Sequence, residues 1–214
     1  MIFIKNYDII YIQSKERIWI YMKVLIVVDM QNDFIDGSLG TPEAQGIVTN
    51  VCNEIVRRAD KDTVILFTRD THPENYMDTL EGKNLPVSHC IEGTHGWEIN
   101  DAVWGTYIAC ADKYMKSADI VYPFAINQVI DKPTFGSIDL QNVLFVIEDS
   151  VAPIEEITLM GLCTGICVMS NAILCKATLP EVPVNVVENC SACVTPDTHK
   201  TAIEAMKLCQ INII

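Results

Sequence analysis

The chain has 214 residues, of which half are hydrophobic and a fifth are charged, so we expect one globular domain rather than a disordered or low-complexity chain. Asp and Glu number 28 against 15 Lys and Arg, which gives a formal net charge of -13 at pH 7. This charge repels nucleic-acid phosphates and anionic lipid surfaces, so we expect no nucleic acid and no membrane as a partner.

Residues 1–21 are interpreted as an N-terminal extension to a domain over residues 22–214. They are rich in Ile, Tyr and Lys and show no signal-peptide pattern, and a buried-strand pattern begins only after Met22. Our hypothesis is that the native protein starts at Met22, and a genuine edge strand or arm is the alternative. Mass spectrometry of the protein made from its own gene tests this, because an N-terminus upstream of Met22 would refute the late start.

From Met22 onward, short apolar runs alternate with helical patterns, which predicts an α/β domain of βα units around a parallel sheet. The predicted strands are residues 24–28, 64–68, 127–130, 158–162 and 184–187. The predicted helices are residues 42–59, 137–145, 166–177 and 196–209, with capping signals at Ser137 and Thr195. Residues 71–122 are predicted to be a long irregular loop, and such loops are usually functional.

Reactive side chains follow four consecutive predicted strands. Asp29 follows the first, Asp70 and His72 follow the second, Lys132 follows the third, and the segment 163–167 follows the fourth. Ligands of parallel sheets bind outside the carboxyl ends of the strands, where loops open and helix N-termini point their amides. Any one such residue is commonplace as a cap or turn residue, but together they predict a site at this edge.

Cys167 is the best candidate for a nucleophile. It lies at the step from strand to helix, where the helix dipole and free amides are expected to lower a thiol's pKa and to hold an oxyanion. An odd count of nine cysteines favours free thiols in a reducing cytoplasm over a disulfide framework. Six other thiols are predicted to be structural: Cys52, Cys110, Cys175, Cys190, Cys193 and Cys209.

The predicted loop supplies a possible ligand set for a divalent metal. Asp70, His72, Glu81 and His89 offer oxygen and imidazole ligands that suit Zn²⁺, Mn²⁺ or Fe²⁺. Spacing alone equally allows solvated loop side chains.

Five motifs in order resemble the isochorismatase-like cysteine hydrolases, and within them the nicotinamidase/pyrazinamidase branch. They occupy residues 28–34 (VDMQNDF), 68–72 (TRDTH), 85–94 (LPVSHCIEGT), 131–137 (DKPTFGS) and 163–167 (CTGIC). The resemblance extends from Lys23 to about Lys207, and it implies a single-domain, three-layer α/β/α fold with a mostly parallel, doubly wound sheet.

The resemblance implies a catalytic triad of Asp29, Lys132 and Cys167. It also implies an oxyanion hole formed by the backbone amides of Cys163 and Cys167, with a cis peptide between Leu162 and Cys163. The expected activity is release of ammonia from a small carboxamide through a thioester on the cysteine, with nicotinamide as the first expected substrate.

The resemblance further implies a metal, zinc in the first instance with Mn²⁺ or Fe²⁺ as alternatives. Its expected ligands are Asp70, His72, Glu81 and His89. Relatives commonly form dimers or tetramers, so a homo-oligomer is expected.

Two departures from the nicotinamidase pattern bear on the substrate. Residues 85–88 carry no aromatic side chain before His89, and Gly165-Ile166 precede Cys167 in place of an acidic or His pair. Phe34, Trp97 or Tyr107 could supply a ring wall instead, and the predicted substrate contacts are Phe34, Leu162 and Trp97.

Two other functional readings stay open. One is a different family activity, such as cleavage of a carbamoyl or ureido amide or hydrolysis of an isochorismate-type ether, although an ether hydrolase has no need for Cys167. The other is a non-catalytic redox or metal-binding module that uses Cys163, Cys167 and the metal loop.

Overall fold

Six parallel strands form one sheet in the residues that this computed structural model describes, 21–115 and 128–214. The strands are β1 (Met22–Val28), β2 (Thr63–Asp70), β3 (Val129–Lys132), β4 (Ile154–Leu162), β5 (Val184–Ala192) and β6 (Asn212–Ile213). Their order across the sheet is β3-β2-β1-β4-β5-β6, and every pair is parallel. The extension predicted over residues 1–21 lies outside the described residues, apart from Tyr21.

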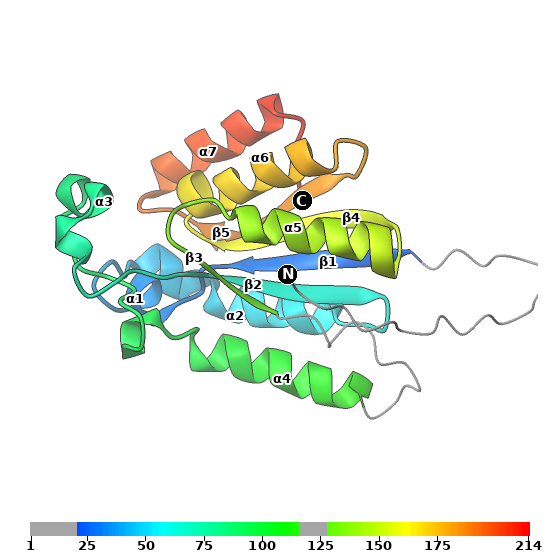
Figure 1. Ribbon diagram of the computed structural model, residues 1–214, viewed down its shortest axis with the longest axis horizontal. Helices are drawn as coiled ribbons and strands as arrows, with labels where there is room; N and C mark the ends of the chain where they lie inside the picture. The colour runs from blue at the N-terminus through cyan, green and yellow to red at the C-terminus, as the bar shows by residue number, and fades with distance from the viewer. Residues whose placement is uncertain (1–20, 116–127) are drawn as a thin grey trace, which may run out of the picture.

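Helices cover both faces of the sheet, as Figure 1 shows. The longer helices are α2 (Pro42–Arg58), α4 (Asp101–Met115), α5 (Ile138–Val146), α6 (Met169–Thr178) and α7 (Pro196–Leu208). Helices α5, α6 and α7 pack on one face and α2 and α4 on the other. The predicted three-layer, doubly wound α/β fold is therefore confirmed.

The sequence of β1 explains why it lies at the centre of the sheet. A near-continuous apolar run suits a strand that is covered on both faces, since successive side chains point to opposite sides. Val24 and Ile26 enter the core beneath α5, α6 and α7, whereas Leu25 and Val27 enter the core beneath α2 and α4. All four side chains are at most 1% exposed.

The predicted helix starts are capped as expected. The hydroxyl of Ser137 accepts a hydrogen bond from the amide of Leu140 at the start of α5, and Thr195 caps α7 in a capping box, with Pro196 as the first helical residue. These caps satisfy amides that the first helical turn leaves without partners.

The prediction of an irregular loop over residues 71–122 is wrong in its second half, where α4 occupies Asp101–Met115. Val103, Tyr107 and Ala111 are buried at four-residue intervals and pack against the sheet. Exposed Ile108 and the half-buried Trp104 add apolar residues off this face, which blurs the helical period in the sequence. Residues 116–122 lie outside the described residues.

Smaller elements between residues 30 and 100 shape one end of the sheet. They are α1 (Asn32–Ile35), α3 (Leu80–Asn84) and two single turns of 3₁₀-helix, η1 (Tyr76–Asp78) and η2 (His95–Trp97). Two π-helical turns, η3 (Ile147–Val151) and η4 (Thr164–Val168), precede β4 and α6. The sequence predicted a single helix over residues 166–177, whereas η4 and α6 divide this segment.

Strand ends differ from the predictions by a few residues. The predicted third strand began at residue 127, which lies outside the described residues, whereas β3 ends two residues later than predicted, at Lys132. The two-residue β6 was not predicted. Among the described helices, none is both long and apolar enough to cross a membrane.

Candidate active site

The strand order reverses between β1 and β4, where crossover connections leave in opposite directions. In such folds ligands bind in the crevice outside the carboxyl ends of the strands at this point. Val28 pairs with Gly161 at this point. A Cβ on Gly161 would lie 2.1 Å from the carbonyl oxygen of Val28, so only glycine allows the strands to approach this closely. Asp29 and the segment 163–167 follow these paired residues directly.

The backbone around this crevice adopts two special conformations. Asp29 has a positive φ of 46°, which turns the chain sharply at the end of β1. The peptide between Leu162 and Cys163 is cis, as the sequence resemblance implied. Both features lie where the two central strands end.

Three side chains from three strand ends meet in the crevice. The Nζ of Lys132 lies 2.7 Å from Oδ2 of Asp29 and 3.5 Å from Sγ of Cys167. Oδ1 of Asp29 accepts a hydrogen bond from the hydroxyl of Thr68 at 2.7 Å. Asp29 and Lys132 are at most 1% exposed and Cys167 is 5% exposed. The structure thus brings together the three residues that were predicted as a triad.

Burial and charge set the protonation of these groups. Burial raises the pKa of Asp29, against the opposing charge of Lys132. Burial also disfavours the charge on Lys132, but the adjacent Asp29 and Cys167 hold the pKa of this ammonium above its usual value. Burial, and then the charge of Asp29, raises the pKa of Cys167 well above that of a free thiol.

The expectation that helix amides lower the pKa of Cys167 is therefore wrong for this site. Burial and a neighbouring carboxylate outweigh the Lys132 ammonium and any effect of the helix terminus. The resting nucleophile is a thiol, and it needs a base before it can attack. Oδ2 of Asp29 has no hydrogen-bond partner among the described residues beyond its ion pair with Lys132, so it can accept the thiol proton.

A second cluster lies beside the first and contains the four predicted metal ligands. One ligand atom from each of Asp70, His72, Glu81 and His89 lies within 4.8 Å of all the others. Nε2 of His72 is 2.9 Å from Oδ2 of Asp70 and 3.7 Å from Oε1 of Glu81, and Nε2 of His89 is 3.6 Å from the same Asp70 oxygen. Two imidazoles with two carboxylates are a donor set that fits a divalent metal such as zinc.

Backbone contacts orient this second cluster. Nδ1 of His89 lies 2.8 Å from the carbonyl oxygen of Val87, which aims the other ring nitrogen at Asp70. The side chain of Gln31 donates to the carbonyl of Asp70 at 2.8 Å and accepts from its amide at 2.7 Å. Gln31 is completely buried, and it fixes the backbone that carries Asp70.

Asp70 joins the two clusters. One of its carboxylate oxygens faces the imidazoles, and the other lies 3.2 Å from Nζ of Lys132. Burial opposes ionisation of Asp70, but hydrogen bonds from His72 and His89 and the charge of Lys132 hold its pKa below the usual range. Asp70 therefore presents a carboxylate to both clusters.

Three polar residues that support the site were not singled out from the sequence. They are Gln31, Thr68 and Asn171. Asn171 donates to the carbonyl of Cys167 at 2.8 Å and to that of Phe135 at 3.1 Å, and it accepts from the amide of Ser137 at 3.0 Å. Most of these contacts join residues at least 34 positions apart, so the sequence alone did not reveal them. The exception is the bond from Asn171 to Cys167, four residues away.

Aromatic side chains surround the metal-ligand cluster. The ring of Phe34 is 5.5 Å from that of His89, and Tyr76 packs on His72 and His89 at 4.6 and 4.9 Å. Trp97 donates to the hydroxyl of Thr71. Phe34 on α1 thus packs beside a predicted metal ligand, Trp97 on η2 lies near the ligand cluster through Thr71, and Tyr76 is an aromatic neighbour that the sequence analysis missed.

Tyr107, suggested as a wall residue, and Leu162, predicted as a substrate contact, both belong to the core. Tyr107 is 3% exposed and packs edge-on against Phe67 at 5.1 Å, so the suggestion that it could line the substrate is wrong. The side chain of Leu162 is 1% exposed within the core beneath α2 and α4.

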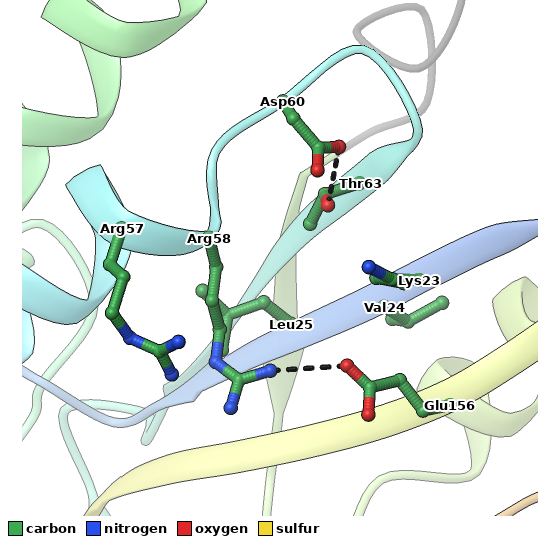
Figure 2. A pocket seen from close by; sticks show the side chains of 8 residues that line it. All are labelled: Lys23, Val24, Leu25, Arg57, Arg58, Asp60, Thr63 and Glu156. Carbon is green, nitrogen blue, oxygen red and sulfur yellow. Dashed lines mark hydrogen bonds and ion pairs between the residues drawn. The ribbon is translucent and has the colours of Figure 1, made fainter.

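A pocket of about 160 Å³ lies at the opposite end of the sheet, near the first residues of β1, β2 and β4. Figure 2 shows the side chains that line it. Several of its charged residues pair within the chain, since Arg58 contacts Glu156 at 3.2 Å and Glu54 at 2.6 Å. Asp60 accepts a hydrogen bond from the hydroxyl of Thr63 at 2.7 Å. The ion pairs of Arg57 and Arg58 give this pocket the chemistry of a structural ion-pair network.

All nine cysteines are described and none forms a disulfide, which confirms the prediction of free thiols. Burial raises the pKa of Cys163 to about 12 and that of Cys175 to about 12, so neither is an activated nucleophile.

Comparisons with known proteins identify the family to which this chain belongs. Residues 23–108 and 109–214 match the family model described as the isochorismatase domain. The chain belongs to the isochorismatase family. The nicotinamidase of Saccharomyces cerevisiae is 33% identical over 126 residues, which cover 46% of this chain and 56% of the yeast protein.

Two further members of this family match over more of their length. The nicotinamidase/pyrazinamidase of Mycobacterium tuberculosis is 23% identical over 197 residues, which cover 90% of this chain and 98% of that protein. The pyrazinamidase of Pyrococcus horikoshii, solved in complex with zinc, superposes with a TM-score of 0.68 at 25% identity and covers 90% of this chain and 98% of its own.

Proposed function

We propose that this isochorismatase-family protein is an amidohydrolase that converts nicotinamide and water to nicotinate and ammonia. The observation that carries the proposal is the contact of a buried ammonium with a carboxylate and a thiol: Lys132 lies 2.7 Å from Asp29 and 3.5 Å from Cys167. Nicotinamidase relatives supply the substrate class.

Asp29 acts first, as the general base. It takes the proton from the Cys167 thiol while the sulfur attacks the carboxamide carbon. Because the two events occur together, the thiol, whose pKa is raised, need never become a free thiolate, and Asp29, whose pKa is also raised, is a base strong enough to accept the proton. The carbonyl π electrons move to oxygen, and the amides of Cys163 and Cys167 stabilise the resulting oxyanion. Lys132 offsets the negative charge that passes between sulfur and carboxylate.

Asp29 then acts as the acid. It returns the proton to the amide nitrogen, the carbon–nitrogen bond breaks, and ammonia leaves a thioester on Cys167. In the second half, Asp29 takes a proton from water, the water oxygen forms the new bond to the acyl carbon, and the sulfur departs and regains its proton. The acid product and the free enzyme result.

The metal-ligand cluster would position the substrate. Asp70, His72, Glu81 and His89 would hold the ion, for which we propose zinc on the strength of two imidazole ligands beside two carboxylates. A divalent ion there would act as a Lewis acid toward a ring nitrogen or a bound water and so orient the substrate. Phe34 and Trp97 are proposed to flank the ring, and Leu162 supports the cis peptide from within the core.

Ammonia release from a panel of amides tests the proposal. The panel contains nicotinamide, pyrazinamide, benzamide, an aliphatic amide and an N-carbamoyl compound, each assayed with and without a chelator. We expect turnover of the first two, a loss of activity in chelator and recovery with added Zn²⁺. Turnover of the carbamoyl compound alone would replace the proposed substrate, and no turnover of any amide would refute the amidohydrolase.

Two further parts of the description are proposals. We propose self-association into a dimer or tetramer, supported by the apolar residues that α5 exposes, with Ile138 76% and Val146 55% exposed. Sedimentation velocity tests it, and a monomer at micromolar concentration would refute it. We also propose a cytoplasmic location, supported by nine free thiols.

A further inference from the structure

We infer that His199 is a positioning residue for this hydrolysis, because its imidazole holds Thr164 and thereby the backbone turn that carries the oxyanion-binding amides. The inference rests on the proposed function and extends it to a helix that contributes no residue to the triad. Helix α7, which carries His199, follows β5 and packs against η4, the turn that contains Cys167.

A single polar contact joins the two elements. Nδ1 of His199 and the hydroxyl of Thr164 share a hydrogen bond at 2.8 Å. Thr164 is completely buried and directly follows Cys163, the residue that contributes the amide nitrogen of the cis peptide. The imidazole thus fixes a side chain next to one of the two amides that are proposed to hold the oxyanion.

The turn itself is tightly closed. The carbonyl of Cys163 accepts hydrogen bonds from the amides of Ile166 at 3.0 Å and Val168 at 3.2 Å, so residues 163–168 move together. A Cβ on Gly165 would lie 3.2 Å from Cβ of Ala202 on α7, so helix and turn are in close contact. Loss of the hydrogen bond that fixes Thr164 to His199 on α7 is therefore expected to reorient the amides of both Cys163 and Cys167.

The surroundings of His199 favour a positioning role over a role in stability. The side chain is 20% exposed and borders a pocket of about 240 Å³, so truncation enlarges an open space and leaves no sealed cavity. Its second nitrogen is 4.0 Å from Oε1 of Glu188, beyond hydrogen-bond distance. The contact with Thr164 is the specific interaction that truncation removes.

Paired substitutions separate the hydrogen bond from the bulk of the side chains. His199→Ala and Thr164→Val each remove the bond, whereas His199→Asn places an amide group where Nδ1 lies and Thr164→Ser keeps the hydroxyl. Lys200→Ala, at the next and exposed position of α7, is the matched control. The assays are kcat and KM for nicotinamide and the melting temperature of each full-length variant.

We expect His199→Ala and Thr164→Val each to lower kcat about tenfold while KM changes less than about twofold, since misplaced oxyanion donors weaken the transition state more than the ground state. The double variant should be no worse than either single one, because both remove the same bond. His199→Asn and Thr164→Ser should retain kcat within about threefold, and Lys200→Ala should match the parent protein. Unchanged kcat in His199→Ala, or a loss in His199→Asn as deep as in His199→Ala, would overturn the inference.

A second measurement reads the oxyanion site without amide turnover. Cys167 can add to pyridine-3-carbaldehyde, forming a carbon–sulfur bond as the π electrons move to oxygen and Asp29 takes the thiol proton. His199→Ala should lower the affinity for this aldehyde about tenfold and leave the affinity for nicotinate unchanged. A parent protein that binds the aldehyde but releases no ammonia would refute the proposed function alone, and equal aldehyde affinity in both proteins would refute the role of His199. A parent protein that does neither would overturn both.

Discussion

Two clusters of charged side chains lie at opposite ends of the same sheet, and they differ in burial and in what they contact. At the carboxyl ends, Lys132 and Asp29 have side chains that are 0% exposed and lie beside a thiol and a metal-ligand set. At the amino ends, Arg57 is 63% exposed and Arg58 is 14% exposed, and both pair with Glu54. Arg58 also pairs with Glu156, as Figure 2 shows.

The difference shows how to distinguish a functional cluster from a structural one. Burying an ion pair costs solvation energy that the pair's attraction rarely exceeds, so a fold that needs only stability has little reason to keep Lys132 beneath the surface. A catalytic site that excludes water does have a reason to bury this charge, because charges there act more strongly on a developing oxyanion or thiolate. Substitutions at the carboxyl ends should therefore change catalysis, and those at the amino ends should change stability.

The largest expected effect is at Cys167. Cys167→Ala removes the nucleophile and should lower kcat for ammonia release by at least about a thousandfold while the melting temperature stays close to that of the parent protein. Cys209→Ala, which removes an exposed thiol on the end of α7, is the control and should keep full activity. Substantial activity in Cys167→Ala would mean that Cys167 is not the nucleophile and that the cluster at the carboxyl ends of the strands does not perform the reaction as proposed.

The next effect is at the metal-ligand cluster. His89→Ala removes one of the four proposed ligands, so the purified protein should lose most of its bound metal, and KM should rise about tenfold or more while kcat falls less. Metal content by mass spectrometry and Michaelis–Menten analysis measure both changes. His95→Ala, at an exposed histidine outside the ligand set, should leave metal content unchanged. Full metal content in His89→Ala would exclude it as a ligand.

A smaller effect, on stability alone, is expected at Glu54. Hydrogen bonds from Arg57 lower the pKa of Glu54, with Arg58 contributing as well, and the carboxylate therefore stabilises the fold above its unfolded pKa. Glu54→Gln should lower the free energy of unfolding at pH 7 by about 1–2 kcal/mol, and the difference should shrink as the pH falls below about 4.3. Denaturant titrations at several pH values measure it, and unchanged kcat is expected.

The smallest effect is expected at Arg57. Its side chain is largely solvent-exposed, so Arg57→Ala should change the free energy of unfolding by at most about 0.5 kcal/mol, and less at high salt. Arg58→Ala, which loses contacts with Glu54 and Glu156 in a partly buried position, should cost more. An equal cost for the two arginines would contradict the role given to burial.

Much of this comparison is visible in the sequence, for physical reasons that concern particular residues. The apolar runs of β1 and β4 predict buried parallel strands, and parallel strands bring their carboxyl ends to one edge, so Asp29, Lys132 and the segment 163–167 were expected together. Helix α4 was missed because Trp104 and Ile108 blur its periodicity.

Other features depend on distances that no pattern in the chain encodes. The link from Asp70 to Lys132 and the bond of His199 to Thr164 join residues 62 and 35 positions apart. The sequence predicted a lowered pKa for Cys167, because a helix terminus can be recognised in sequence. Burial beside Asp29, which raises this pKa, cannot be recognised there.

The covalent intermediate is the most direct test that one sulfur at the carboxyl ends performs the reaction. The protein is mixed with nicotinamide, quenched in acid during steady turnover, digested and mapped by mass spectrometry. We predict a nicotinoyl group on the peptide that carries Cys167, absent once the substrate is exhausted. Steady ammonia release with the acyl group on another side chain, or with no acyl group at Cys167, would contradict the account.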